Sequence, residues 1–255
     1  MLDAARLDVY LEARQQSLIE LGARIQNPVR IEGVTCLRCT GAENGTCYRC
    51  DDWISRGDEA DRVIPLAYGV YNTQFRSELR AYKNESFPRG QQPALRTLRA
   101  LMWSFSYYHA GCLIAVSSEA PTVVTTVPSG RARQGMHPFE KVAQFAPAEW
   151  DRVDALRRYD IEERACDPES VTFRNSEVLD GQHVVVLDDA WATGSKAEGV
   201  AMAARREGAT EVTIITIGRI VNTSYSPAQP LLQLVGGTTW DWRQCPVTGS
   251  VCPDS

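Results

Sequence analysis

Apolar residues recur at helical spacing in several stretches of the chain. Leu95, Leu98 and Leu101, for example, fall on one face of a helix, and Pro93 suits its first turn. By this criterion the predicted helices cover residues 3–24, 75–83, 91–110, two pieces within 138–158, and 196–208. The charged, aperiodic segment 157–170 is instead expected to form a loop.

Shorter apolar or β-branched runs predict strands at residues 64–71, 122–127, 183–189 and 211–218. The last two strands and the helix between them span about 35 residues, the length of a βαβ unit with parallel strands and a right-handed crossover. We therefore predict an α/β fold with an open, mostly parallel sheet and flanking helices. Its expected parts are an N-terminal helix (1–32), a cysteine-rich knuckle (33–53) and an α/β domain with a C-terminal extension (54–255).

Composition adds mainly exclusions. The chain has 255 residues, 44% of them apolar, and a formal net charge of −5, which argues against nucleic acid as the main partner. No apolar run reaches the ~18 residues of a membrane span, and the N-terminal sequence is too charged for a secretory signal. The expected location is the cytoplasm, with no membrane partner, and the sequence is compatible with a homodimer.

Cytosolic proteins seldom form disulfides, so the cysteine-rich knuckle needs another explanation. Cys36, Cys39, Cys47 and Cys50 follow the pattern C-x2-C-x7-C-x2-C, in which two tight turns present four thiols to one ion. We predict a closed structural zinc site, with unligated or redox-active cysteines as the alternative. A nucleic-acid-binding finger is disfavoured because acidic residues match the neighbouring arginines.

A second, looser cysteine pair, Cys245 and Cys252, lies near the C-terminus. A metal site there would need ligands from elsewhere, and the histidines of the chain are His109, His137 and His183. We interpret the pair as free thiols or as a clasp of the C-terminal segment.

The strand at 183–189 ends on two adjacent carboxylates. Asp188 and Asp189 precede Thr193, Gly194 and Ser195, a small polar turn that opens the next helix. In an open parallel sheet, ligands bind beyond the carboxyl ends of the strands, and a helix N-terminus attracts an anion. The acids suit vicinal hydroxyls or hydrated Mg²⁺, so a sugar phosphate fits both halves. The alternative is a polar turn in which Ser195 only caps the helix.

This stretch, HVVVLDDAWATGSK, resembles the motif that binds phosphoribosyl diphosphate (PRPP) in type I phosphoribosyltransferases, where two acids and a short spacer precede T-G-x-T. The order of other elements resembles the ComF-like, competence-associated subgroup. Its features are matched here by the four-cysteine element, by a strand and helix ending at Lys83, by VPSGRARQGMHPF and by ALRRYDIEER. The resemblance covers roughly residues 33–220.

The resemblance implies a glycosyltransferase that binds PRPP with Mg²⁺ and displaces pyrophosphate from ribose C1, with a nitrogen compound or water as acceptor. It implies that Asp188 and Asp189 orient the ribose hydroxyls and the metal. The residues that would hold the 5-phosphate are Ala192, Thr193, Gly194, Ser195 and Lys196. Those of the pyrophosphate loop would be Ser129, Gly130, Arg131 and Arg133, and the loop closing over the site would carry Arg157, Arg158 and Arg164.

Two departures from the family pattern keep other functions open. Lys196 stands where the family usually has threonine, and Q-G-M-H at 134–137 stands where R-G-F-N is familiar. The alternatives are a non-catalytic module that senses PRPP or a nucleotide, and a zinc-dependent protein that interacts with nucleic acid.

Overall fold

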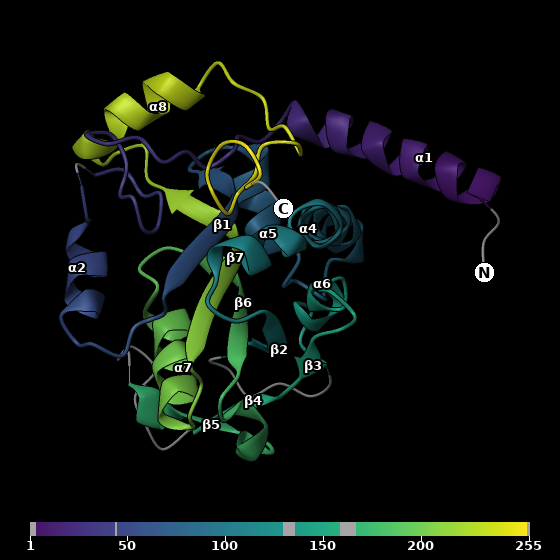
Figure 1. Cartoon of the computed structure of the whole chain (residues 1–255). Helices are drawn as coiled ribbons and strands as arrows, with labels where there is room; N and C mark the ends of the chain where they lie inside the picture. Colours follow the sequence, from purple (N-terminus) through teal and green to yellow (C-terminus); the bar gives the residue numbers. More distant parts are fainter. Residues whose placement is uncertain (1–3, 44, 130–135, 159–166, 254–255) are drawn as a thin grey trace.

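The computed structural model describes residues 4–43, 45–129, 136–158 and 167–253 (Figure 1). At its centre is a five-stranded sheet in the order β1-β7-β6-β2-β3, with every neighbouring pair parallel. The strands are β1 (Arg62–Val70), β2 (Pro121–Thr126), β3 (Asp151–Arg152), β6 (His183–Trp191) and β7 (Glu211–Val221). The predicted α/β fold with a parallel sheet is confirmed.

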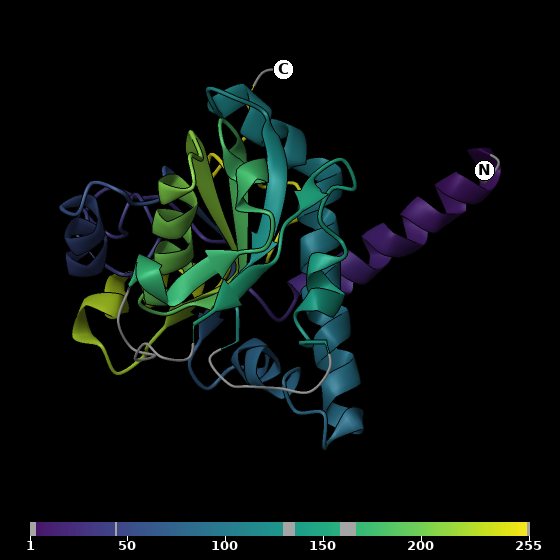
Figure 2. The same ribbon diagram turned by 90° about the horizontal axis from the view of Figure 1, so that it is seen from below.

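Helices cover both faces of this sheet (Figure 2). One face packs against α3 (Gln74–Ala81), α4 (Pro88–Tyr108), α5 (Ala110–Val116) and α6 (Glu140–Ala143). The other face packs against α7 (Ser195–Arg206) and against the cysteine-rich segment with α2 (Tyr48–Ile54). Alternate residues of each strand serve the two cores; in β6, Val185 lies on the α4 side and Val184 on the α7 side. A strand buried on both faces needs the continuous apolar run seen in its sequence.

The two terminal segments lie together. Helix α1 (Ala4–Gly22) projects from the body in Figure 1, and its last turn packs into the α4-side core through Leu18 and Leu21. The C-terminal segment, after η3 (Ser226–Ala228) and α8 (Gln229–Val235), returns to this point. There the amide of Trp240 donates to the carbonyl of Gly22 at 3.0 Å. Its indole Nε1 donates to the carbonyl of Leu66 at 3.0 Å.

The prediction of two helical pieces within 138–158 was wrong for most of that stretch. Only α6 is helical there, and the chain continues through turns into β3 and β4 (Ala155–Arg157). Pro147, which has no amide proton to donate, interrupts the helical pattern. Strand β4 pairs antiparallel with β5 (Val171–Phe173), and two short 3-10 helices, η1 (Pro168–Ser170) and η2 (Ser176–Leu179), flank β5. The short helix α2 in the knuckle was not predicted either.

Among the described residues, no helix combines the length and the apolar character that crossing a membrane requires.

Candidate functional site

The chain reverses its direction across the sheet between β2 and β6. After β2 it moves outward to β3 with α6 on one face, and after β6 it moves to β7 through α7 on the other face. Crossovers on opposite faces leave a crevice beyond the carboxyl ends of those two strands. The segments that follow β2 and β6 line one cleft of about 730 Å³ at this place.

The two acids at the end of β6 point to opposite faces of the sheet, as successive strand residues must. The carboxylate of Asp189 lies on the α3 side, where it accepts a hydrogen bond from the hydroxyl of Tyr82 and pairs with the ammonium group of Lys83. The carboxylate of Asp188 accepts from the amide of Asp189 at 2.8 Å. Asp188 lines both the large cleft and a neighbouring one of about 630 Å³ on the α7 side.

The surroundings of Asp188 disfavour its charged form. Burial, together with the negative charge of Asp189, raises the pKa of its carboxyl from 3.8 to about 8. Lys83 and Lys196 oppose this shift but do not cancel it. A cation bound beside this carboxyl would stabilise its ionised form, which the surroundings otherwise disfavour.

We expect Asp188→Asn to stabilise the ligand-free protein at pH 8 by about 2 kcal/mol, a part of the full linkage energy because the cleft admits solvent. The folded state of the wild type retains a proton that the unfolded state has lost. Wild-type stability therefore falls as pH rises from about 4 to about 8, and the variant avoids this loss. Urea unfolding of both proteins between pH 5 and pH 8 should show a difference that widens with pH.

The matched control is Asp154→Asn. This carboxylate is 66% exposed, and its ion pair with Arg174 is long, at 3.8 Å. Its effect should stay within about 0.5 kcal/mol at every pH. If Asp188→Asn destabilised the protein by the same amount at every pH, the raised pKa of this carboxyl would be contradicted.

The turn after β6 has the features of an anion-binding loop. Gly194 precedes α7 with a φ of +82°, and a side chain at this position would overlap the buried ring of Trp191. The hydroxyls of Thr193 and Ser195 lie 3.0 Å apart. Within the described part of the chain, the amides of Thr193, Gly194 and Ser195 donate to no backbone carbonyl outside the helix, and the first amides of a helix have no intrahelical partner.

Cations outnumber acids around the large cleft. Its charged lining residues are Arg76, Arg80, Lys83, Lys196, Asp188 and Asp189, four positive against two negative. The neighbouring cleft adds Arg49 from α2, opposite the loop of Thr193 to Lys196. The Nε atom of Arg76 is buried and has no hydrogen-bond partner among the described residues. The site as a whole therefore suits an anion.

The structure brings many of the predicted residues together. The large cleft is lined by Ser129, Asp188, Asp189, Ala192 and Lys196, and the neighbouring cleft adds Thr193, Gly194 and Ser195. The expected residues Gly130, Arg131, Arg133 and Arg164 lie outside the described residues.

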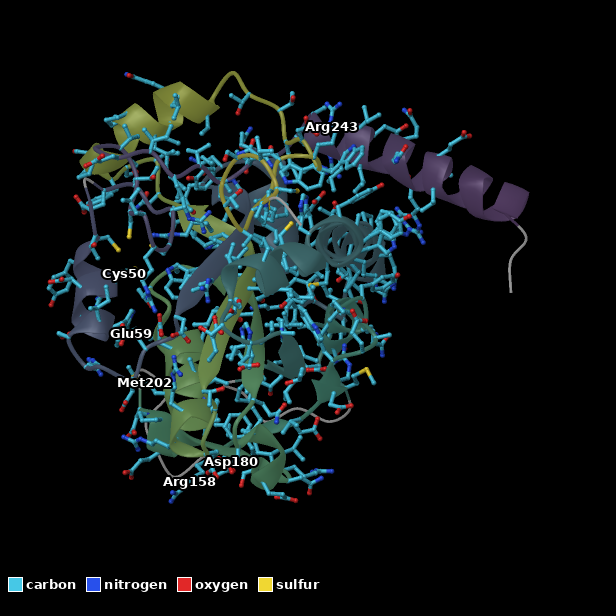
Figure 3. All side chains as sticks on the ribbon, viewed as in Figure 1. Cys50, Glu59, Arg158, Asp180, Met202 and Arg243 are labelled. Carbon is cyan, nitrogen blue, oxygen red and sulfur yellow. The ribbon has the colours of Figure 1, made fainter. Side chains whose placement is uncertain are left out.

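Arg158 does not lie where the loop-closing prediction requires. Its amide donates to the carbonyl of Ser170 at 2.8 Å, beside η1, whose Glu169 lies 3.7 Å from Arg206 in the last turn of α7. The anion-binding loop lies at the first turn of α7, so Arg158 and this loop lie at opposite ends of the helix. Figure 3 shows Arg158 at the same end of the molecule as Asp180, which precedes β6. The antiparallel pairing of β4 with β5 holds it there.

The sequence prediction included Lys83 only as the end of a family-like helix, and it did not include Arg76, Arg80 or Tyr82. Arg76 and Arg80 are four residues apart and share one face of α3, and Lys83 follows two residues after the end of that helix. That spacing was a usable signal. Lys83, typical in sequence of a surface charge at a helix end, is in fact the ion-pair partner of Asp189.

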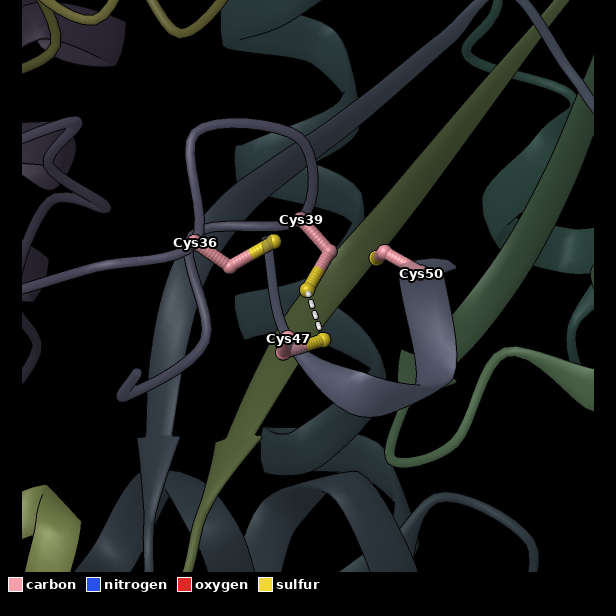
Figure 4. Close-up of side chains that lie close together, drawn as sticks. All are labelled: Cys36, Cys39, Cys47 and Cys50. Atoms are coloured by element: carbon pink, nitrogen blue, oxygen red, sulfur yellow. Dashed lines mark hydrogen bonds between the residues drawn. The ribbon is translucent and has the colours of Figure 1, made fainter. Parts of the chain in front are cut away.

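The four knuckle cysteines form one cluster (Figure 4). Their sulfur atoms lie within 4.8 Å of one another, and none of them forms a disulfide. The sulfurs of Cys39 and Cys47 are 3.8 Å apart, which matches the edge of about 3.8 Å of a tetrahedron with Zn–S bonds of about 2.3 Å. Cys36, Cys39 and Cys50 are fully buried. The tetrad could hold a structural metal such as zinc.

Three side chains connect this tetrad to the anion-type loop. Arg219 donates from Nε to the carbonyl of Cys39 at 3.1 Å and from Nη1 to the carbonyl of Trp191 at 3.1 Å. The indole of Trp53 donates to the carbonyl of Thr193 at 3.3 Å. Arg38 lies between Cys50 and Glu198 of α7. The knuckle thus supports the loop mechanically.

No family model and no curated protein matches the chain. Among solved structures, a hypoxanthine phosphoribosyltransferase from Staphylococcus aureus is similar at 12% identity and a TM-score of 0.31, covering 49% of this chain and 75% of that one. A structure described as an alanine mutant from an analysis of an invariant aspartic acid in HPRTs is similar at 13% identity and a TM-score of 0.31. That match covers 50% of this chain and 78% of the other. Likenesses of this size do not establish a shared ancestry or activity.

Proposed function

We propose that this chain is a phosphoribosyltransferase-like enzyme of the ComF-like type that binds PRPP with Mg²⁺ in the cleft beyond β2 and β6. The observation that carries the proposal is the convergence, at the switch point of the sheet, of the Asp188 carboxyl with an amide-rich loop and a surplus of cations. A sugar that bears an anion at each end matches this arrangement.

Each part of the cleft has a task in this proposal. The loop of Ala192 to Lys196 holds the 5-phosphate through its amides and hydroxyls, with Arg49 facing it. Asp188 accepts from the ribose hydroxyls or carries the hydrated metal, and Asp189 fixes Lys83 at the edge of the cleft. Ser129, with Arg76 and Arg80, faces the pyrophosphate.

The reaction breaks the bond between ribose C1 and the pyrophosphate oxygen while the acceptor nitrogen bonds to C1. Positive charge builds on the ring, and negative charge builds on the leaving group. Mg²⁺ would supply neutralisation of that leaving group. The protein's own residues hold the sugar still, so that the acceptor meets C1 in a fixed orientation.

Calorimetric titration of the full chain with PRPP tests this proposal. We expect saturable binding that requires Mg²⁺, weakened at least about 100-fold in the double variant Asp188→Asn with Asp189→Asn, because both charged acceptors are removed. Asp154→Asn, far from the cleft residues in the sequence and highly exposed, should bind as the wild type does. Wild-type protein that does not bind PRPP, or a double variant with unchanged affinity, would refute the assignment.

A non-catalytic PRPP sensor is the second candidate. It is favoured by the prior engagement of Asp189 with Tyr82 and Lys83, which leaves one acid fewer for the metal and the ribose. Pyrophosphate release measured across nitrogen acceptors distinguishes the two candidates. Release above the rate in the double variant supports the enzyme, whereas tight binding without release supports the sensor.

A further inference from the structure

A second group of metal-ligating side chains lies where the junction of α4 and α5 meets the C-terminal segment. It consists of His109, Cys112, Cys245 and Cys252, whose ligand atoms lie within 4.8 Å of one another. His109 and Cys112 stand at the start of α5, and Cys252 follows His109 by 143 residues. The sequence alone left Cys245 and Cys252 without partners, and the fold supplies two.

Both halves of this group are shaped by local backbone bonds. The amide of Cys112 donates to the carbonyl of His109 at 3.0 Å, which sets the two side chains on one turn. In the C-terminal loop the amide of Cys245 donates to Ser250 at 2.9 Å, and that of Gly249, with a φ of +87°, donates back to Cys245 at 2.8 Å. This closed loop brings together two thiols that are separated by six residues.

The imidazole is oriented as a ligand would be. Its Nε2 atom lies 2.8 Å from the carbonyl oxygen of Trp242, which can only accept, so Nε2 carries the proton. The lone pair of Nδ1 then faces the thiols, 3.5 Å from the sulfur of Cys252. Bonds of about 2.3 Å to sulfur and about 2.05 Å to nitrogen give a tetrahedral edge of about 3.6 Å. A carbonyl behind a ligating histidine is the usual second support of such a site.

Burial and charge agree with a bound cation. Cys245 is fully buried, and His109 and Cys112 are 3% and 8% exposed, whereas Cys252 lies at the surface and leaves a route for an ion. Three thiolates and one imidazole around a divalent ion carry one net negative charge. Arg30 lies nearby and donates to the carbonyl of Pro246 in the same loop at 3.0 Å.

We propose that His109, Cys112, Cys245 and Cys252 form a second zinc site of the three-cysteine, one-histidine type. Four protein ligands close the coordination shell, so the ion is structural, and soft thiolates with imidazole select zinc among the common divalent metals. The site fastens the C-terminal segment to the helical layer. In that segment the ring of Trp242 packs on Tyr108 with centroids 4.4 Å apart.

Zinc content per chain tests the proposal. Full-length protein produced with zinc in the medium and measured by plasma mass spectrometry should hold about two ions per chain. Cys245→Ser and Cys47→Ser should each hold about one, and the double variant almost none. Ser250→Ala, in the same loop but with an exposed side chain and no thiol, should retain two. Wild-type protein with a single ion that disappears in Cys47→Ser would overturn the second site, as would two ions in Cys245→Ser.

X-ray absorption at the zinc edge keeps the test decisive if Cys245→Ser does not fold. The wild type with both sites filled should average about 3.5 sulfur and about 0.5 nitrogen ligands per zinc, from one four-sulfur shell and one shell of three sulfurs and one nitrogen. A pure four-sulfur shell excludes the second site. Thiol titration of the denatured wild type distinguishes the remaining outcome, a disulfide within the group, which would also contradict zinc.

Discussion

Replacing Cys39 by serine is expected to lower the midpoint of thermal unfolding by at least about 10 °C and to remove one zinc ion per chain. The Cys39 side chain is fully buried in the core that it shares with α7, and its sulfur lies 3.8 Å from that of Cys47. A structural zinc contributes on the order of 10 kcal/mol to small zinc domains, comparable with the whole stability of a typical protein. Even a loss of about 5 kcal/mol gives the stated shift, at about 2–4 °C per kcal/mol.

Leu37→Ala is the matched control for this prediction, because Leu37 lies in the same loop with its side chain 49% exposed. Its midpoint should change by no more than about 2 °C. A strong chelator should lower the wild-type midpoint at least as far as that of Cys39→Ser, and it should lower the midpoint of the variant, which has lost the tetrad zinc already, by less. A variant that unfolds within about 2 °C of the wild type, with the same zinc content, would show that the tetrad binds no structural metal.

The sheet could be predicted from the sequence because each central strand is apolar on both faces. The run from His183 to Leu187 is buried throughout. A strand buried on both faces is a continuous apolar run, which can be recognised in the sequence without knowing which face each residue occupies. The helix prediction for residues 138–158 was wrong because buried residues there recur at a spacing that helices and short turns can both produce. Val142, Trp150 and Val153 are buried at near-helical intervals, but short turns around Pro147 deliver them to the core.

The candidate site was predictable only where it is local. Asp188, Asp189 and the loop at Gly194 are adjacent in sequence, and their chemistry follows from a strand, a turn and a helix. Tyr82 meets Asp189 across 107 residues, and this contact depends on how α3 packs on the sheet. The same holds for His109, which meets Cys252 only after the C-terminal segment has folded back.

Arg38→Met is expected to destabilise the protein by about 3–5 kcal/mol, because it breaks a buried ion pair. Arg38 pairs with Glu198 at 2.6 Å and donates to the carbonyl of Ala60 at 2.7 Å, and the Glu198 side chain has no solvent exposure. Removing one partner of a buried pair leaves the other charge uncompensated. Urea unfolding at pH 7 measures the loss, and zinc content should stay at the wild-type value.

Two comparisons separate this buried pair from ordinary surface charge. Arg56→Met removes an arginine that is 44% exposed and pairs with Asp52 at 3.0 Å, and should cost no more than about 1 kcal/mol. Adding Glu198→Met to Arg38→Met should recover part of the lost stability, since no buried charge then remains.

Burial raises the pKa of Glu198 even beside Arg38, so without the arginine the folded state holds a proton that the unfolded state releases. The deficit of Arg38→Met should therefore grow as pH rises from 5 to 8; a constant deficit, or a double variant less stable than the single one, would assign the loss to packing instead.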